Sequence, residues 1–161
     1  MKDRLHQINV SYSGKEDRLL LRVTTYLGDE YRVWLTRRFT SLLYGVLIKA
    51  MEQHGGAQAI GSEDRTKNMF KSGALEKKFD EGKTRNLPFG EDGFLAYSIK
   101  SGQTQDGQLR IEILPETGKG VTLNLTRHLL YMMHNLLMQG IARAEWQLVS
   151  DTGFTSLQQK H

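Results

Sequence analysis

A match of the chain with itself constrains the fold more than any other feature of the sequence. When the sequence is shifted by 90 residues, residues 17–50 align with residues 107–140 without a gap. The run Leu-Thr-Arg that begins at Leu35 recurs at Leu125, and the apolar positions keep the same register throughout the match. Because internal similarity of this kind marks a repeated structural unit, we expect the chain to fold as two related units.

Each unit contains three strand patterns followed by one helix pattern. The alternation of apolar and polar residues that is typical of strands occurs at 7–12, 18–26 and 31–35, and again at 94–100, 108–114 and 120–125. Thr36 and Thr126 stand where a helix N-cap is expected, because a threonine hydroxyl accepts a hydrogen bond from the first helical turn. A helical apolar spacing follows each of them. We therefore expect an α+β fold of two pseudo-symmetric βββα units, with antiparallel sheets that carry the helices on one face.

The boundaries of the units follow from the same patterns. We expect a single domain over residues 1–161, with the first unit at 5–53 and the second at 93–149. The stretch 54–92 is polar and predicts a mobile linker, since long segments without periodicity are rarely part of a core. The tail 150–161 is expected to fray.

Composition excludes several classes of protein. Hydrophobic residues make up 39% of the chain and charged residues 25%, which is typical of a globular protein. No run of apolar residues is long enough for a transmembrane helix, so no membrane partner is expected. The chain has no cysteine, which excludes disulfides and cysteine-ligated metals and favours a cytoplasmic location.

No motif in the sequence predicts catalysis or a cofactor. His128 and His134 are six residues apart, which is not the spacing of a helical metal site. The chain also lacks a nucleophile elbow and a glycine-rich phosphate loop. We therefore expect no enzyme, with no catalytic residue, no metal and no cofactor.

The sheet face opposite the helices carries the best candidates for a binding site. Strict alternation places Arg22, Arg32 and Trp34 on that face in the first unit and Arg110 in the second. An aromatic ring stacks on a nucleobase and arginines pair with phosphates. Two further arginines begin the first helix, where their charge and the free N–H groups suit an anion. The predicted nucleic-acid-binding residues are thus Arg22, Arg32, Trp34, Arg37, Arg38 and Arg110.

Other interpretations of these residues remain open at the level of sequence. Arginines on a solvent-facing sheet also serve solubility, and Trp34 is explained as well by the linker or a dimer partner covering it. Arg37 and Arg38 equally fit salt bridges to nearby carboxylates.

The order of elements resembles that of a known group of binding proteins. Two strand-rich units, each ending in a helix and related by a repeat, are similar to the Whirly and PUR-type single-stranded nucleic acid binders. Those families have four strands per unit, whereas this sequence predicts three. The resemblance implies binding to single-stranded DNA or RNA.

Two functional hypotheses follow. The first is a non-enzymatic protein that binds single-stranded DNA or RNA through a basic and aromatic sheet face. The second is a protein-interaction or assembly module, with a homodimer as one form of it. Its surface would be Trp34 with Met132, Met133 and Met138 of the second helix, although Met132 and Met133 fit an ordinary core better.

Overall fold

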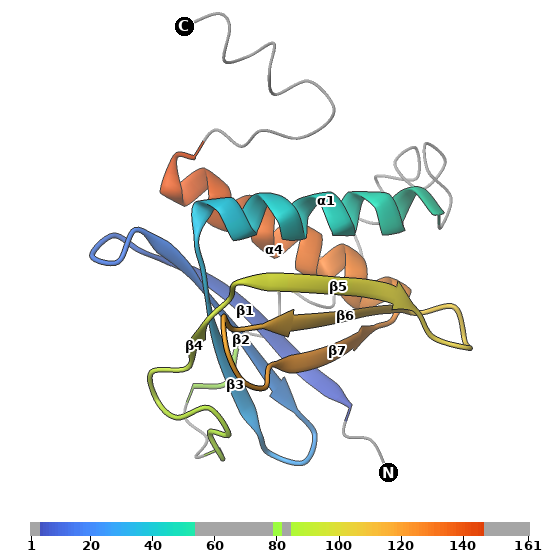
Figure 1. Cartoon of the computed structure of the whole chain (residues 1–161), viewed down its shortest axis with the longest axis horizontal. Helices are drawn as coiled ribbons and strands as arrows, with labels where there is room; N and C mark the ends of the chain where they lie inside the picture. Colours follow the sequence, from blue (N-terminus) through green and yellow to red (C-terminus); the bar gives the residue numbers. More distant parts are fainter. Residues whose placement is uncertain (1–3, 54–78, 82–84, 147–161) are drawn as a thin grey trace, which may run out of the picture.

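The computed structural model describes residues 4–53, 79–81 and 85–146 (Figure 1). Most of the predicted linker and the whole tail 150–161 lie outside the described residues. The described strands and helices are β1 (Leu5–Ser13), β2 (Arg18–Thr25), β3 (Glu30–Leu35), α1 (Arg37–Gln53), β4 (Phe94–Leu95), β5 (Ser98–Gln103), β6 (Leu109–Leu114), β7 (Val121–Leu125) and α4 (Arg127–Ala144). The α+β class is confirmed by these two helices and two largely antiparallel sheets.

The first sheet has the order β1-β2-β3-β4. β2 pairs antiparallel with both β1 and β3, with Leu19 opposite Leu35. Alternate side chains of β2, namely Leu19, Leu21 and Val23, are fully buried, because one face of the sheet covers the core. The short β4 pairs parallel with the edge of β3, so this sheet is not purely antiparallel.

The second sheet has the order β5-β6-β7 and is antiparallel, with Leu109 opposite Leu125. The single strand predicted at 94–100 is wrong, because the chain changes sheets there. The N–H of Ala96 donates to the carbonyl of Trp34 in the first sheet at 2.9 Å, and the N–H of Tyr97 donates to Leu114 in the second at 2.8 Å. Residues 94–95 and 98–103 therefore belong to different sheets.

Both helices lie on the same side of the two sheets and cross each other (Figure 1). The expected N-caps are confirmed, since the Thr36 hydroxyl accepts from the N–H of Phe39 at 3.0 Å and that of Thr126 accepts from Leu129 at 3.2 Å. Helix α4 packs across β1 and β2 of the first sheet, and α1 contacts β5 of the second. Each sheet is thus covered in part by the helix that follows the other sheet in the chain.

The core lies between the sheets and the helices. Its largest fully buried side chains come from both sheets and both helices, and include Leu21, Phe39, Ile111, Leu123 and Met133. In the part of the chain that the structure describes, no helix has the length and apolar character needed to cross a membrane.

Candidate nucleic-acid interface

The outward face of the first sheet brings together three of the residues predicted from the sequence. Arg22 of β2 lies directly opposite Arg32 of β3, and Trp34 follows two positions later on the same face. Two like charges at opposed positions destabilise a sheet unless a counter-charge lies between them.

Glu30 supplies that counter-charge. It begins β3 and is only 3% exposed. Its carboxylate accepts from Nε of Arg32 at 2.6 Å and from Nε of Arg22 at 3.2 Å, and Arg85 donates to it at 2.7 Å. We call Arg22, Arg32, Arg85 and Glu30 the arginine cluster. Within it all three guanidinium groups donate to one carboxylate.

The electrostatics of Glu30 follow from these partners. Burial alone would raise its pKa, because a charged carboxylate loses hydration. The hydrogen bonds from Arg32, Arg22 and Arg85 outweigh burial and lower the pKa to about 2. Glu30 is therefore ionised at neutral pH and holds the cluster together.

A segment of the predicted linker covers this face. The carbonyl of Asn86 accepts from the N–H of Glu30 at 2.8 Å, and the carbonyl of Asp92 accepts from Nε1 of Trp34 at 3.0 Å. Gly93 lies so close to β3 that an added Cβ would fall 2.1 Å from the carbonyl oxygen of Arg32. Residues 85–95 thus run along β3, which agrees with the interpretation that the linker covers Trp34.

Residues 79–81 also contact the arginine cluster. The guanidinium carbon of Arg22 lies 4.4 Å from the centre of the Phe79 ring, and that of Arg85 lies 5.1 Å from it. Glu81 forms an ion pair with Arg22. As the structure stands, Arg22 and Arg32 therefore have partners within the chain.

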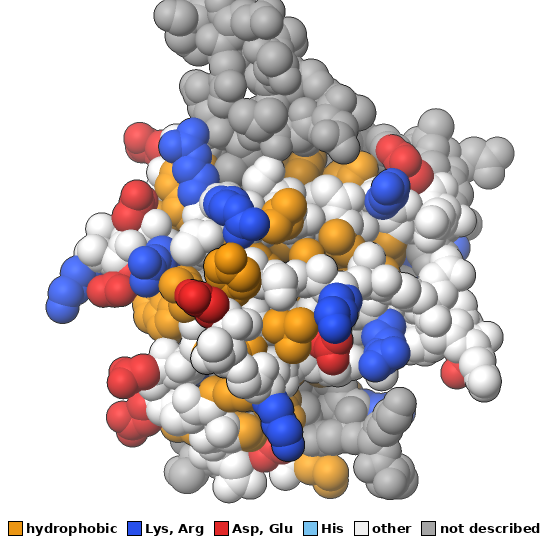
Figure 2. Space-filling model, in the orientation of Figure 1, with side chains coloured by type: hydrophobic (Ala, Val, Ile, Leu, Met, Phe, Trp, Pro, Cys, Tyr) orange, Lys and Arg blue, Asp and Glu red, His pale blue; other side chains and the backbone are white. Residues whose placement is uncertain are grey.

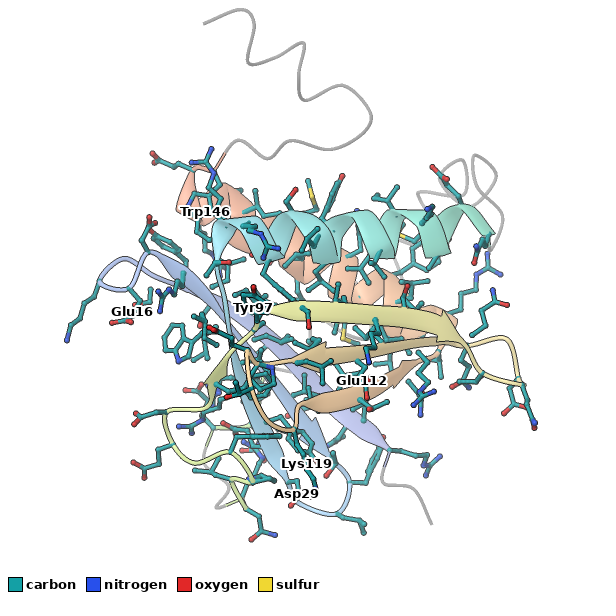
Figure 3. All side chains as sticks on the ribbon, viewed as in Figure 1. Glu16, Asp29, Tyr97, Glu112, Lys119 and Trp146 are labelled. Carbon is teal, nitrogen blue, oxygen red and sulfur yellow. The ribbon has the colours of Figure 1, made fainter. Side chains whose placement is uncertain are left out.

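The first turn of α1 leads to a different surface. Arg37 and Arg38 are exposed there. Arg38 donates to the carbonyl of Tyr97 at 3.4 Å, and its guanidinium carbon lies 5.9 Å from the centre of the Tyr97 ring. Tyr97 is 52% exposed and lies where the chain enters β5 (Figure 3). Leu95, which is 41% exposed, precedes it, and we call Arg38, Leu95 and Tyr97 the Tyr97 patch.

The outward face of β5, β6 and β7 adjoins this patch and is open. Lys100 lies opposite Glu112, and Arg110 lies opposite Asn124. Among the described residues no ion pair involves Lys100 or Arg110. Figure 2 shows Lys and Arg side chains on this part of the surface, with an acidic side chain beside them. We call this surface, with Thr122, the open face.

The sequence pointed to some of these residues and not to others. Arg110 and Arg38 were predicted and are exposed, whereas Tyr97 and Lys100 were not predicted. The error in the strand at 94–100 hid Tyr97, because its exposure depends on the change of sheet. Glu30 stands two positions before Arg32, and this spacing indicates a carboxylate on the same sheet face as the arginines.

The methionines of α4 divide as their spacing suggested. Met133 is fully buried, Met132 is partly buried against the core, and Met138 is exposed. In the described residues no three His, Asp or Glu side chains gather as a metal site requires.

Comparison with known proteins adds no family to these observations. No protein-family model matches the chain, and neither a curated protein nor a solved structure matches it.

Proposed function

We propose that this protein binds single-stranded DNA or RNA without catalysing a reaction, through the open face and the Tyr97 patch. One observation carries the proposal: an exposed aromatic ring lies beside Arg38 at the start of β5, and β5 and β6 continue from it with Lys100 and Arg110 facing outward. A cytosolic setting is part of the proposal, since the chain has no cysteine.

The chemistry of this surface fits a single strand. Stacking on an aromatic ring contributes about 1–3 kcal/mol per base and tolerates any sequence. Lys100 and Arg110 would pair with successive phosphates, and such contacts release counterions and make binding depend on salt. Glu112 lies opposite Lys100, two positions along β6 from Arg110, and limits the positive charge of the face. We therefore expect moderate affinity.

The test is fluorescence anisotropy of a labelled oligothymidine, titrated with protein at low and at moderate salt. Tyr97→Ala should weaken binding about tenfold, as the loss of one stacked base predicts. Lys100→Glu with Arg110→Glu should abolish binding and its salt dependence. The control is Lys15→Glu with Lys49→Glu, which changes the net charge equally at exposed positions outside the open face. Equal losses in both double variants would contradict the proposal.

We also infer that the two strand-and-helix units are pseudo-symmetric. In the first sheet Leu19 lies opposite Leu35, and in the second Leu109 lies opposite Leu125, so both positions differ by 90. The helices begin 90 residues apart, at Arg37 and Arg127.

The contact between the helices supports the same inference. Tyr44 of α1 stacks on His134 of α4 with ring centres 5.6 Å apart, and these two positions also differ by 90. Equivalent positions meet each other where a two-fold axis passes. A crystal structure in which the two units are superimposed tests this inference, and helices that fail to coincide when the sheets are superimposed would contradict it.

A second candidate function is a protein-interaction module, including a homodimer. A groove of about 820 Å³ between α1 and β5 favours it, because apolar side chains of Leu42, Val46 and Ile48 line the groove. Binding of this kind is insensitive to salt. Light scattering that shows a dimer at low and high salt alike, lost in Leu42→Glu, would support this candidate.

A further inference from the structure

We propose that the arginine cluster of the first sheet is a second nucleic-acid site, which the chain's own Phe79 and Glu81 occupy in this structure. The inference rests on the proposed function, because it assigns the same ligand class to the other sheet. It concerns residues 79–81 and the cluster, all of which the structure describes.

The surroundings of the Phe79 ring fit a nucleobase. Two guanidinium groups, those of Arg22 and Arg85, lie 4.4 Å and 5.1 Å from its centre. Arginine stacks on any π-face, and nucleobases are held on guanidinium planes in the same way. A base in the place of Phe79 would therefore keep both contacts.

The charge of the arginine cluster fits a phosphate. The cluster has three guanidinium groups and one buried carboxylate, Glu30, so it carries an excess of two positive charges without Glu81. The Glu81 side chain is 68% exposed while that of Arg22 is 15% exposed. An exposed carboxylate on a largely buried arginine is a weak partner, and a phosphate with more acceptor oxygens would replace it.

The Phe79 ring and the Glu81 carboxylate lie on one short stretch of backbone. Phe79 and Glu81 are two residues apart and both contact Arg22. A nucleotide likewise presents a flat base and an anionic group close together. Trp34 lies on the same sheet face and stays partly exposed beside the Asp92 carbonyl that accepts from its Nε1, so the exposed part of its ring offers a surface for a neighbouring base.

Glu81→Gln and Glu91→Gln provide a matched pair for the test. Each removes one negative charge from an exposed position of the predicted linker 54–92. Among the described residues, the structure assigns a side-chain contact with the arginine cluster to Glu81 and not to Glu91. Glu81→Gln combined with Phe79→Ala should raise the affinity for labelled oligothymidine about tenfold, because an exposed ion pair and a cation–π contact no longer compete. Glu81→Gln alone should raise it severalfold, and Glu91→Gln should not.

The open face is disabled in a second series, so that the two sites are measured apart. In the Lys100→Glu, Arg110→Glu background, Phe79→Ala with Glu81→Gln should restore salt-dependent binding. When Trp146→Phe is added to this variant, Trp34 is the remaining tryptophan. The oligonucleotide should quench its fluorescence, because Trp34 adjoins the second site.

The outcomes separate this inference from the proposed function. If the unmodified protein binds through the open face, but Glu81→Gln and Phe79→Ala increase binding no more than Glu91→Gln does, the second site does not exist. A different result is that the unmodified protein does not bind, whereas the Phe79→Ala, Glu81→Gln variant binds and its Trp34 fluorescence is quenched. This result would support the second site and contradict binding through the open face.

Discussion

Glu30 decides the character of the first sheet at the scale of a single residue. It lies on the outward face, yet burial and three guanidinium partners make it part of the interior. Removing one member of such a buried ionic group leaves uncompensated charge, which costs more than an exposed ion pair contributes.

Glu30→Gln should therefore lower the free energy of unfolding by about 3 kcal/mol, measured by urea denaturation. Glu16→Gln is the control, because the Glu16 side chain forms an exposed ion pair with Arg18 at 3.9 Å. That control should change stability by less than about 1 kcal/mol. Similar losses in the two variants would mean that the arginine cluster contributes little to folding.

Acid should reveal the same carboxylate. The pKa of Glu30 is lowered to about 2 in the folded protein from an ordinary value of 4.5. The ionised carboxylate therefore contributes fully to the free energy of unfolding above about pH 4.5. This contribution, about 3 kcal/mol in all, is lost as the pH falls toward 2. Urea denaturation across this range should show a smaller loss for Glu30→Gln than for the unmodified protein, and parallel curves would contradict this.

At the scale of elements, residues 85–95 determine which sheet face is covered. This stretch makes two short parallel contacts with the first sheet, one at Asn86 and one at Phe94. Gly93 permits the second contact, because its φ of +65° and its approach to Arg32 both exclude a side chain.

Gly93→Ala should therefore destabilise the protein by about 2 kcal/mol or more, as the contact adds to the cost of a left-handed residue. Gly90→Ala is a matched control on the same stretch, since Gly90 also has a positive φ of +80° but has open space around it. It should cost about 1 kcal/mol. Thermal or urea unfolding of the two variants makes the comparison, and equal costs would mean that the stretch does not hold tightly to β3.

At the scale of the whole molecule, the helices tie the two sheets together. Helix α4 follows the second sheet but packs on β1 and β2, and Gly140 allows it to approach Val10 and Leu19. Trp146 lies just after α4 (Figure 3). It meets Tyr12 of β1 edge-to-face with ring centres 6.1 Å apart. Each sheet therefore loses part of its cover if the other unit unfolds.

The described part of the chain should consequently unfold in one transition. The chain has two tryptophans, so Trp146→Phe leaves Trp34 in the first sheet as the reporter and Trp34→Phe leaves Trp146 beside α4. Fluorescence-detected urea denaturation of each should give curves of the same shape as circular dichroism of the same variant. Separate transitions by fluorescence and circular dichroism would contradict this coupling.

The amino-acid sequence by itself determined the local elements. Apolar alternation placed β2, β3, β6 and β7, and the threonine caps with their apolar spacing placed both helices, since these patterns depend on neighbours in the chain. It also singled out Arg22, Arg32 and Trp34 as sharing one face. Only the tertiary structure decided what covers that face, because residues 79–81 and 85–95 lie far from β2 and β3 in sequence. The exposure of Tyr97 and the exchange of helices between sheets likewise depend on contacts between distant segments, which no local periodicity encodes.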